Sequence, residues 1–470
     1  MPIVKVRPQS WLPKGDALVD AEYPLVVVGG IPGEKEVVDV KVEGPRSATG
    51  QFLESPEPDP RRVTPSCEKI GYCGQCALMH IRPDAQGQIR AELVRDAFYR
   101  EGLGSVPVAE EEPVGIPDMD SRYLVKLGFE SSDRGRTRVG IWSRHSPQVV
   151  AVPQCPVVTP TIRKVMMSLA HHAIEMDLRP WDPVTDYGLL RRALVRESRE
   201  TGEVMLTLVV SKRNRTVVDY AERVATGVSE ITAVWVHVNE GPANEIFQHG
   251  DEGMEDVFRM LGKESITERF GEVLAEIGAE DTVGFNPVVT AAVQSRLITR
   301  LELGEGDAFV HLRSGTGALV TRAAAVASLS IGVEPSERAV VRSHLTAKRA
   351  GVVAGFVHGE IDESIDEVKR RLGEVRPAMV LELHGRGPSE EMMEAVEELR
   401  PRRIGVVAHN PRALASSLKR WLDRYQIEGE VEVFGPAPHT AMTTVFAILQ
   451  DPTAPRQKVR AARRKVVRKR

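Results

Sequence analysis

Four cysteines are the residues of this chain whose types and spacing could do chemistry. Three lie close together, in the run Cys67-Glu-Lys-Ile-Gly-Tyr-Cys73-Gly-Gln-Cys76, and the fourth, Cys155, is followed by a proline. Three close thiolates and a distant one next to proline are typical of the ligands of an iron–sulfur cluster. Clustered cysteines in a reducing compartment are more often metal ligands than disulfides. We therefore expect Cys67, Cys73, Cys76 and Cys155 to bind a 4Fe–4S cluster.

Two other interpretations of the cysteines remain open. Four thiolates also suit zinc in tetrahedral geometry, although the gap between Cys67 and Cys73 is longer than the usual zinc spacing. Buried cysteines can also serve only as apolar core residues, but four such residues would rarely form this pattern. If all four bind a cluster, no thiol is left for nucleophilic catalysis, because the chain has four cysteines in total.

The length and composition predict a multidomain globular protein. A chain of 470 residues is long enough for two or three domains. Its content of 42% hydrophobic and 27% charged residues is ordinary for a soluble protein. We find no apolar run that resembles a signal peptide and none long enough to span a membrane. We therefore expect a cytoplasmic protein without a membrane partner, and we favour a monomer.

The charge of the chain is unevenly distributed. The whole chain has a net charge of −4, and residues 456–470 contain nine Lys or Arg and no acid, which leaves −13 for the rest. Basic terminal runs are typical interaction tails, and phosphate backbone is the partner that such a tail suits best. The cations that we expect to bind RNA are Arg456, Lys458, Arg460, Arg463, Arg464, Lys465, Arg468, Lys469 and Arg470.

The sequence divides into three domains, whose elements must position the cysteines, and the basic tail. We place the boundaries at residues 1–64, 65–270, 271–453 and 454–470. The first domain has apolar or alternating strand patterns at 23–28 and 36–42, which predict a small β-barrel. A proline-rich connector at 55–60 leads to the cysteines. A helical pattern follows at 85–101.

The remaining sequence predicts two further α/β units. Between 123 and 239 the pattern is mostly strand, with a hairpin from 190–198 and 204–211, a helix near 217–225 and a strand at 231–238. After that, strands alternate with helices, as in a doubly wound, largely parallel sheet. The strands are expected at 308–312, 329–333, 352–358, 379–383, 405–408 and 431–434, with helices starting at Ala318 and Ser336.

This order of elements resembles one family. Cys76-Ala-Leu-Met-His80, Gln88 to Arg95, Tyr187 to Arg192 and Glu203 to Leu206 are similar to segments of the RNA uracil-5 methyltransferases that carry a TRAM domain and a 4Fe–4S cluster. The resemblance extends from residue 23 to 449. It implies an OB-like TRAM β-barrel, an α+β iron–sulfur domain and a C-terminal Rossmann-like class I methyltransferase domain. Members use S-adenosylmethionine to methylate uridine in tRNA or rRNA.

The resemblance also shows that the working residues are replaced. The family's cysteine nucleophile adds to uracil C6, and its glutamate base removes the C5 proton. Here the nucleophile motif reads Ala408-His409-Asn410-Pro411, and the base motif ends at Thr444. The aspartate motif at the end of the fourth strand reads Glu382-Leu383-His384-Gly385. We therefore assign no catalytic residue and expect no methylation of uracil by the family mechanism.

The cofactor site is only partly retained. Gly315 and Gly317 lie in a glycine turn after the first strand, and Glu334 ends the second strand, where a carboxylate could hold ribose hydroxyls. A short G-x-G is weak evidence, because it also occurs as a plain strand–helix turn. Three family positions are changed, since the aspartate, tyrosine and glutamine of that site correspond to His311, Arg313 and Pro287.

Three functions follow from this pattern. The first is an RNA-binding iron–sulfur protein, a non-catalytic relative of the RNA methyltransferases, whose partner is structured rRNA or tRNA. The second is an active S-adenosylmethionine-dependent RNA methyltransferase with a non-uracil acceptor, since an RNA nitrogen or oxygen needs no protein thiol. The third is an iron–sulfur sensor in which cluster loss alters RNA binding.

Overall fold

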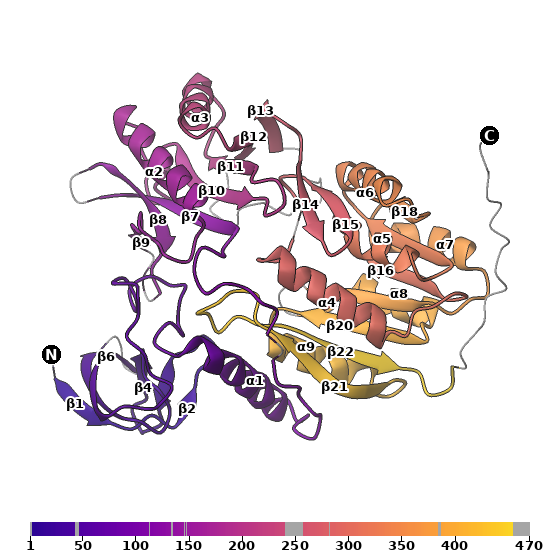
Figure 1. Ribbon diagram of the computed structural model, residues 1–470, viewed down its shortest axis with the longest axis horizontal. Helices are drawn as coiled ribbons and strands as arrows, with labels where there is room; N and C mark the ends of the chain where they lie inside the picture. The colour runs from indigo at the N-terminus through magenta and orange to yellow at the C-terminus, as the bar shows by residue number, and fades with distance from the viewer. Residues whose placement is uncertain are drawn as a thin grey trace.

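The computed structural model describes residues 2–42, 47–111, 113–132, 135–144, 146, 148–239, 257–281, 283–383 and 387–454. Figure 1 shows an N-terminal β unit, a central sheet covered by helices, and a larger C-terminal α/β unit. The basic tail from Arg456 to Arg470 and His384 lie outside the described residues. Among the helices that the structure describes, none is long and apolar enough to cross a membrane.

The N-terminal unit is a six-stranded, barrel-like sheet. Its order is β1-β5-β6-β4-β3-β2, and only the β4–β6 pair is parallel. The expected strands at 23–28 and 36–42 are confirmed as β4 and β5. β6 extends to Glu57, into the predicted connector, because Glu57 still pairs with Lys35 of β5. The strands are β1 Ile3–Val6, β2 Ser10–Trp11, β3 Ala17–Val19, β4 Leu25–Val28, β5 Lys35–Val42 and β6 Ala48–Glu57.

Helix α1 (Pro83–Arg100) joins the N-terminal and C-terminal units. It begins with a proline, has Asp84 in its first turn and Arg100 in its last, which suits the helix dipole at both ends. Val94 and Phe98 are buried in the C-terminal core. The helix expected at 85–101 is confirmed, and it holds the segment after the cysteines against the C-terminal domain.

The central unit is a seven-stranded sheet of order β13-β12-β11-β10-β7-β8-β9. Alternate strand residues share one core with α2 and α3, so these helices cover one face (Figure 1). The expected hairpin is confirmed as the antiparallel pair β10–β11. The elements are β7 Leu124–Ser131, β8 Thr137–Trp142, β9 Val149–Val150, α2 Pro160–Glu175, β10 Leu190–Glu197, β11 Val204–Val210, α3 Arg215–Gly227, β12 Ile231–Val238 and β13 Val257–Gly262.

The C-terminal unit is a seven-stranded sheet of order β18-β17-β16-β19-β20-β22-β21. β16 to β20 are parallel, whereas β22 is antiparallel to β20 and to β21. All six expected strands are present, and β22 was not predicted. The strands are β16 Ala308–Leu312, β17 Leu329–Glu334, β18 Gly355–His358, β19 Ala378–Leu383, β20 Arg403–Ala408, β21 Gln426–Phe434 and β22 Thr444–Gln450.

Helices lie on both faces of this sheet, and a small hairpin precedes them (Figure 1). The helix expected from Ala318 is α5, and the one expected from Ser336 is α6, in which Ser336 is the N-cap. The mixed α/β class is therefore confirmed. The elements are β14 Ile266–Phe270, β15 Val273–Ile277, α4 Pro287–Arg300, α5 Ala318–Ala324, α6 Glu337–Arg349, α7 Ile361–Leu372, α8 Glu390–Leu399 and α9 Pro411–Leu418.

Candidate functional site

The two predicted catalytic positions meet at the end of β20. His409 directly follows β20, and Thr444 opens the neighbouring strand β22. The His409 Nδ1 and Thr444 Oγ1 atoms are 3.1 Å apart and form a hydrogen bond. His409 is exposed, whereas Thr444 is buried. The sheet thus brings together an imidazole and a hydroxyl at the positions where the family has a thiol and a carboxylate.

Asn410 fixes the backbone beside this pair. Its side-chain Oδ1 accepts hydrogen bonds from the backbone N–H groups of Arg412 at 3.0 Å and Ala413 at 3.4 Å. It is therefore the N-cap of α9, and Pro411 occupies the first helical position. Asn410 and Pro411 thus end β20 and start α9. This turn places His409 at the end of the strand.

The glycine turn after β16 is closely packed. Gly315 and Gly317 have positive φ angles of 53° and 69°, which glycine adopts without strain. A Cβ on Gly317 would lie 2.6 Å from the Cβ of Ser343 on α6. The Ser343 hydroxyl in turn donates to the Gly315 carbonyl at 3.2 Å. The second glycine is thus required for the approach of α6, and the first for the turn.

Glu334 organises this turn from the end of β17. Its Oε2 accepts a hydrogen bond from Gly315 N at 2.8 Å, and its Oε1 accepts one from Ser336 N at 3.1 Å. Burial raises the pKa of Glu334. Each carboxylate oxygen has a second lone pair. The structure therefore brings together Gly315 and Glu334, two of the three predicted cofactor residues, in direct contact.

The replaced positions of the cofactor site have new partners. His311, buried in β16, has its Nε2 3.6 Å from Glu382 Oε1 on the adjacent strand β19. Desolvation raises the pKa of Glu382 to about 7, although 36% of its side chain remains exposed, so water still reaches the carboxylate. The Arg313 guanidinium lies 3.4 Å from the Glu360 carboxylate. Pro287 is the first residue of α4, after the N-cap Asn286.

The four cysteines line one small cavity beside the core of the central unit. Cys155 is buried and the other three are partly buried, and Ile70, Met79, Ile141 and Val152 complete the lining. Among the described residues, no three of the cysteine sulfurs lie within 4.8 Å of one another. Burial raises the pKa of Cys73 to about 12, and nearby Cys76 and Cys155 raise it further. The nearby Arg122 guanidinium opposes this shift by lowering the pKa of Cys73.

A histidine pair on α2 was missed by the sequence reasoning. His171, His172 and Glu175 place possible ligand atoms within 4.8 Å of one another, the one such group that the described part of the chain contains. The H-H-x-x-E spacing, one helical turn, could have identified it. Glu175 also forms an ion pair with Arg223 at 3.0 Å and hydrogen-bonds to His172 at 2.9 Å. These contacts explain the cluster as links between α2 and α3.

The loop before Thr444 is held by α1. His439 is buried and has a left-handed φ of 64°. Its backbone N donates to Gln86 Oε1 at 2.8 Å, and its carbonyl accepts from Leu78 N at 2.8 Å. Arg90 donates to the Thr440 carbonyl at 2.9 Å. The segment after the cysteines therefore fixes the loop that leads to Thr444.

No family model matches the chain. It is 24% identical to an uncharacterized RNA methyltransferase of Caldanaerobacter subterraneus, over 91% of this chain and 93% of that one. A similarly named protein of Listeria innocua is also 24% identical, over 91% and 92%. A Pyrococcus abyssi tRNA (uracil-54, C5)-methyltransferase, in complex with S-adenosyl-L-homocysteine, superposes with a TM-score of 0.67, 20% identity and coverage of 95% and 100%. The chain has the fold of this methyltransferase.

Proposed function

We propose that this chain is an RNA-binding protein on an RNA methyltransferase fold that does not methylate carbon 5 of uracil. The His409–Thr444 hydrogen bond carries this proposal, since it occupies the nucleophile and base positions. The likeness to proteins named RNA methyltransferases over nine tenths of the chain supports RNA as the partner. Structured rRNA or tRNA is the class of RNA that we propose.

The chemistry of uracil explains why this pair does not support methylation at carbon 5. Carbon 5 becomes nucleophilic only after a soft, reversible nucleophile adds to carbon 6. A neutral imidazole does not replace a thiolate in that addition. Proton removal from carbon 5 then needs a base of carboxylate type, and a threonine hydroxyl does not ionise near neutral pH. The chain therefore lacks the group that each of these two steps requires.

S-adenosylmethionine remains a ligand that the residues fit. Glu334 would accept hydrogen bonds from the ribose hydroxyls through its free lone pairs, and the N–H groups of the glycine turn would lie beside the cofactor. The bound cofactor would supply an electrophilic methyl group. The S-adenosyl-L-homocysteine in the complex of the Pyrococcus abyssi protein supports S-adenosylmethionine as the ligand proposed here.

The cysteines are proposed to hold a 4Fe–4S cluster. Thiolates around one zinc ion, with Zn–S distances of about 2.3 Å, would lie about 3.8 Å apart. A cubane is larger than a single ion and holds its thiolates further apart, which agrees with the finding that no three of the described cysteine sulfurs all lie within 4.8 Å of one another. Protein purified without oxygen should be brown, and Cys73→Ala should lose the broad absorbance. A colourless protein that contains zinc would refute the cluster.

The deciding experiment combines binding and turnover. Protein purified without oxygen is titrated with labelled tRNA and rRNA fragments, and then with S-adenosylmethionine by calorimetry. We expect RNA binding and no 5-methyluridine after incubation of both ligands with the enzyme. Formation of 5-methyluridine by the unaltered chain would overturn the proposal, and so would an absence of RNA binding.

A second candidate is methylation of a nitrogen or oxygen of RNA. The observation that favours it is His409, whose Nδ1 is held by Thr444 while the side chain is exposed at the strand end. An imidazole in that place can accept the proton of an N–H or O–H acceptor. Transfer of labelled methyl groups to RNA, located by nucleoside analysis on a base nitrogen or a ribose oxygen, would establish this candidate in place of the first.

A further inference from the structure

A polar cavity lies in the central unit, away from the His409–Thr444 pair of the C-terminal unit. It has a volume of about 570 Å³, within the range of small-ligand sites. Three segments form its walls: the end of α2, the loop before β10 and the turn from β11 into α3. The lining residues are Asp177, Leu178, Arg179, Asp186, Tyr187, Gly188, Leu189, Ser211, Lys212 and Asn214.

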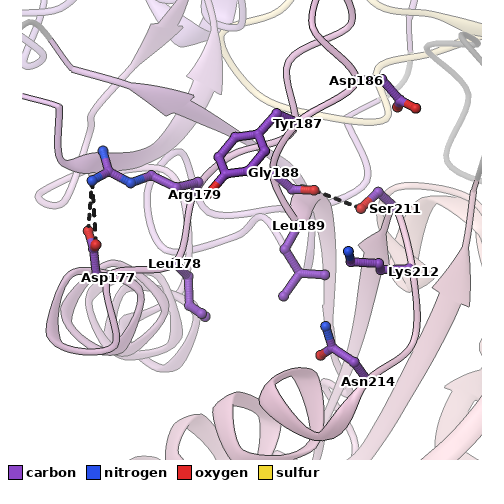
Figure 2. A pocket seen from close by; sticks show the side chains of 10 residues that line it. All are labelled: Asp177, Leu178, Arg179, Asp186, Tyr187, Gly188, Leu189, Ser211, Lys212 and Asn214. Carbon is purple, nitrogen blue, oxygen red and sulfur yellow. Dashed lines mark hydrogen bonds and ion pairs between the residues drawn. The ribbon is translucent and has the colours of Figure 1, made fainter.

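The side chains that point into the cavity are apolar on one side and cationic on the other. Figure 2 shows Leu178, Leu189, Lys212 and Asn214 directed into the hollow, and Arg179 directed away toward Asp177. Leu178 and Leu189 are buried and form an apolar wall. The ring of Tyr187 lies at the rim and is 70% exposed. An exposed aromatic ring beside such a wall is suited to stack on a flat group.

The charged residues of the lining differ in the partners that they have among the described residues. Asp177 forms an ion pair with Arg179 at 3.2 Å, and Asp186 accepts a hydrogen bond from Trp181 Nε1 at 2.8 Å. Lys212 is exposed and forms no ion pair with the residues that the structure describes. Both acids of the lining therefore have a partner in the wall, although the hydrogen bond from the neutral Trp181 leaves the charge of Asp186 in place. The Lys212 ammonium group, which forms no ion pair among the described residues, is the point of the cavity that suits a phosphate.

We propose that this cavity binds one nucleotide of the RNA, with the base against Tyr187 and the leucine wall and the phosphate on Lys212. The inference rests on the proposed function, because RNA is the partner that supplies such a group. The hydroxyl of Ser211 is used within the wall, where it donates to the Gly188 carbonyl at 2.8 Å. The amide of Asn214 remains as a polar group near the base, while its Oδ1 caps α3.

The cavity therefore gives the RNA a second anchoring point, outside the fold's methyltransferase site. A stacked base and one phosphate contact have different signatures in a binding experiment. Stacking is insensitive to salt, and its loss weakens binding at every ionic strength. A phosphate contact releases counterions, so its loss lowers the steepness of the salt dependence.

The test measures the affinity of full-length protein for fluorescein-labelled tRNA and structured rRNA fragments at several salt concentrations. We expect Tyr187→Ala to weaken binding at least fivefold at all salt concentrations. We expect Lys212→Ala to lower the slope of log K against log salt by about 1, and Lys212→Arg to restore it. Circular dichroism confirms that each variant is folded.

Two control variants match these residues. Tyr99, on α1, is 75% exposed, and Lys164, on α2, is exposed and paired with Glu230 at 2.8 Å. Tyr99→Ala and Lys164→Ala should bind like the unaltered chain. If the unaltered chain binds RNA and the Tyr187 and Lys212 variants bind equally well, the cavity assignment alone is overturned. If the unaltered chain binds no RNA, the proposed function fails together with it.

Discussion

Gln86 is a residue through which α1 holds the loop before Thr444. Its side chain is buried, and its Nε2 lies 3.2 Å from the Leu78 carbonyl, 3.0 Å from the Ile81 carbonyl and 3.1 Å from His439 Nδ1. Its Oε1 accepts from His439 N at 2.8 Å. Gln86→Leu would keep nearly the same volume and remove all four contacts, so any effect arises from lost hydrogen bonds rather than from a cavity.

The expected cost is large for one substitution. Each net hydrogen bond contributes about 1 kcal/mol, and a buried N–H left without a partner costs about 1 to 3 kcal/mol. The amide has two hydrogens for three acceptors, so we count three bonds and expect about 3 kcal/mol. His439 also has a left-handed backbone, which costs about 1 to 2 kcal/mol and is retained only while the contacts hold it.

Hydrogen exchange followed by mass spectrometry measures this local effect. A loss of about 3 kcal/mol should accelerate exchange of the peptide 436–443 on the order of 100-fold, since 1.4 kcal/mol corresponds to a factor of ten. Gln88, on the same helix, is exposed, and Gln88→Leu is the matched control. If both variants exchange alike in this peptide, the conclusion that Gln86 holds the loop is refuted.

Three further predictions concern the barrel, the glycine turn and the tail. Burial raises the pKa of Glu36 to about 8, so the folded chain keeps a proton that the unfolded chain loses above about 4.5, and stability falls as pH rises through this window. Urea unfolding of Glu36→Gln should lack this loss, which is up to about 1.4 kcal/mol per pH unit. Gly317→Ala should cost about 2 to 4 kcal/mol by thermal unfolding and weaken S-adenosylmethionine binding, because its Cβ would meet Ser343. Deletion of residues 454–470 should flatten the salt dependence of RNA binding, and an unchanged slope would exclude the tail from the interface.

The regular elements could be predicted because their patterns are local. The runs at 231–238 and 308–312 are mostly apolar, and they agree with β12 and β16 residue for residue. β22 lies between two turns and was missed, although it separates β20 from β21 in the sheet. The sheet order places β22 before β21. This exchange depends on the whole sheet, so no short window of sequence predicts it.

The contacts that hold the candidate site could not be predicted, because they join distant segments. Gln86 and His439 are 353 positions apart, and nothing in either local sequence indicates the other. The cavity beside Tyr187 is formed by three separate segments in the same way. By contrast, Pro287 could have been explained from its neighbours, since Asn-Pro is a signal for the start of a helix.

Four positions at which this chain differs from the resembled family are paired in space. This pairing affects any attempt to restore uracil methylation by substitution. His409 contacts Thr444, and His311 faces Glu382, so four of the replaced positions form two neighbouring pairs. A single substitution such as His409→Cys would introduce a thiol but leave Thr444 unable to act as the base. We expect the double variant His409→Cys with Thr444→Glu to form no 5-methyluridine either, because His311 and Glu382 still alter the cofactor site. Detection of 5-methyluridine with the double variant would show that the loss of uracil chemistry lies at His409 and Thr444 alone, and that the cofactor site functions as it stands.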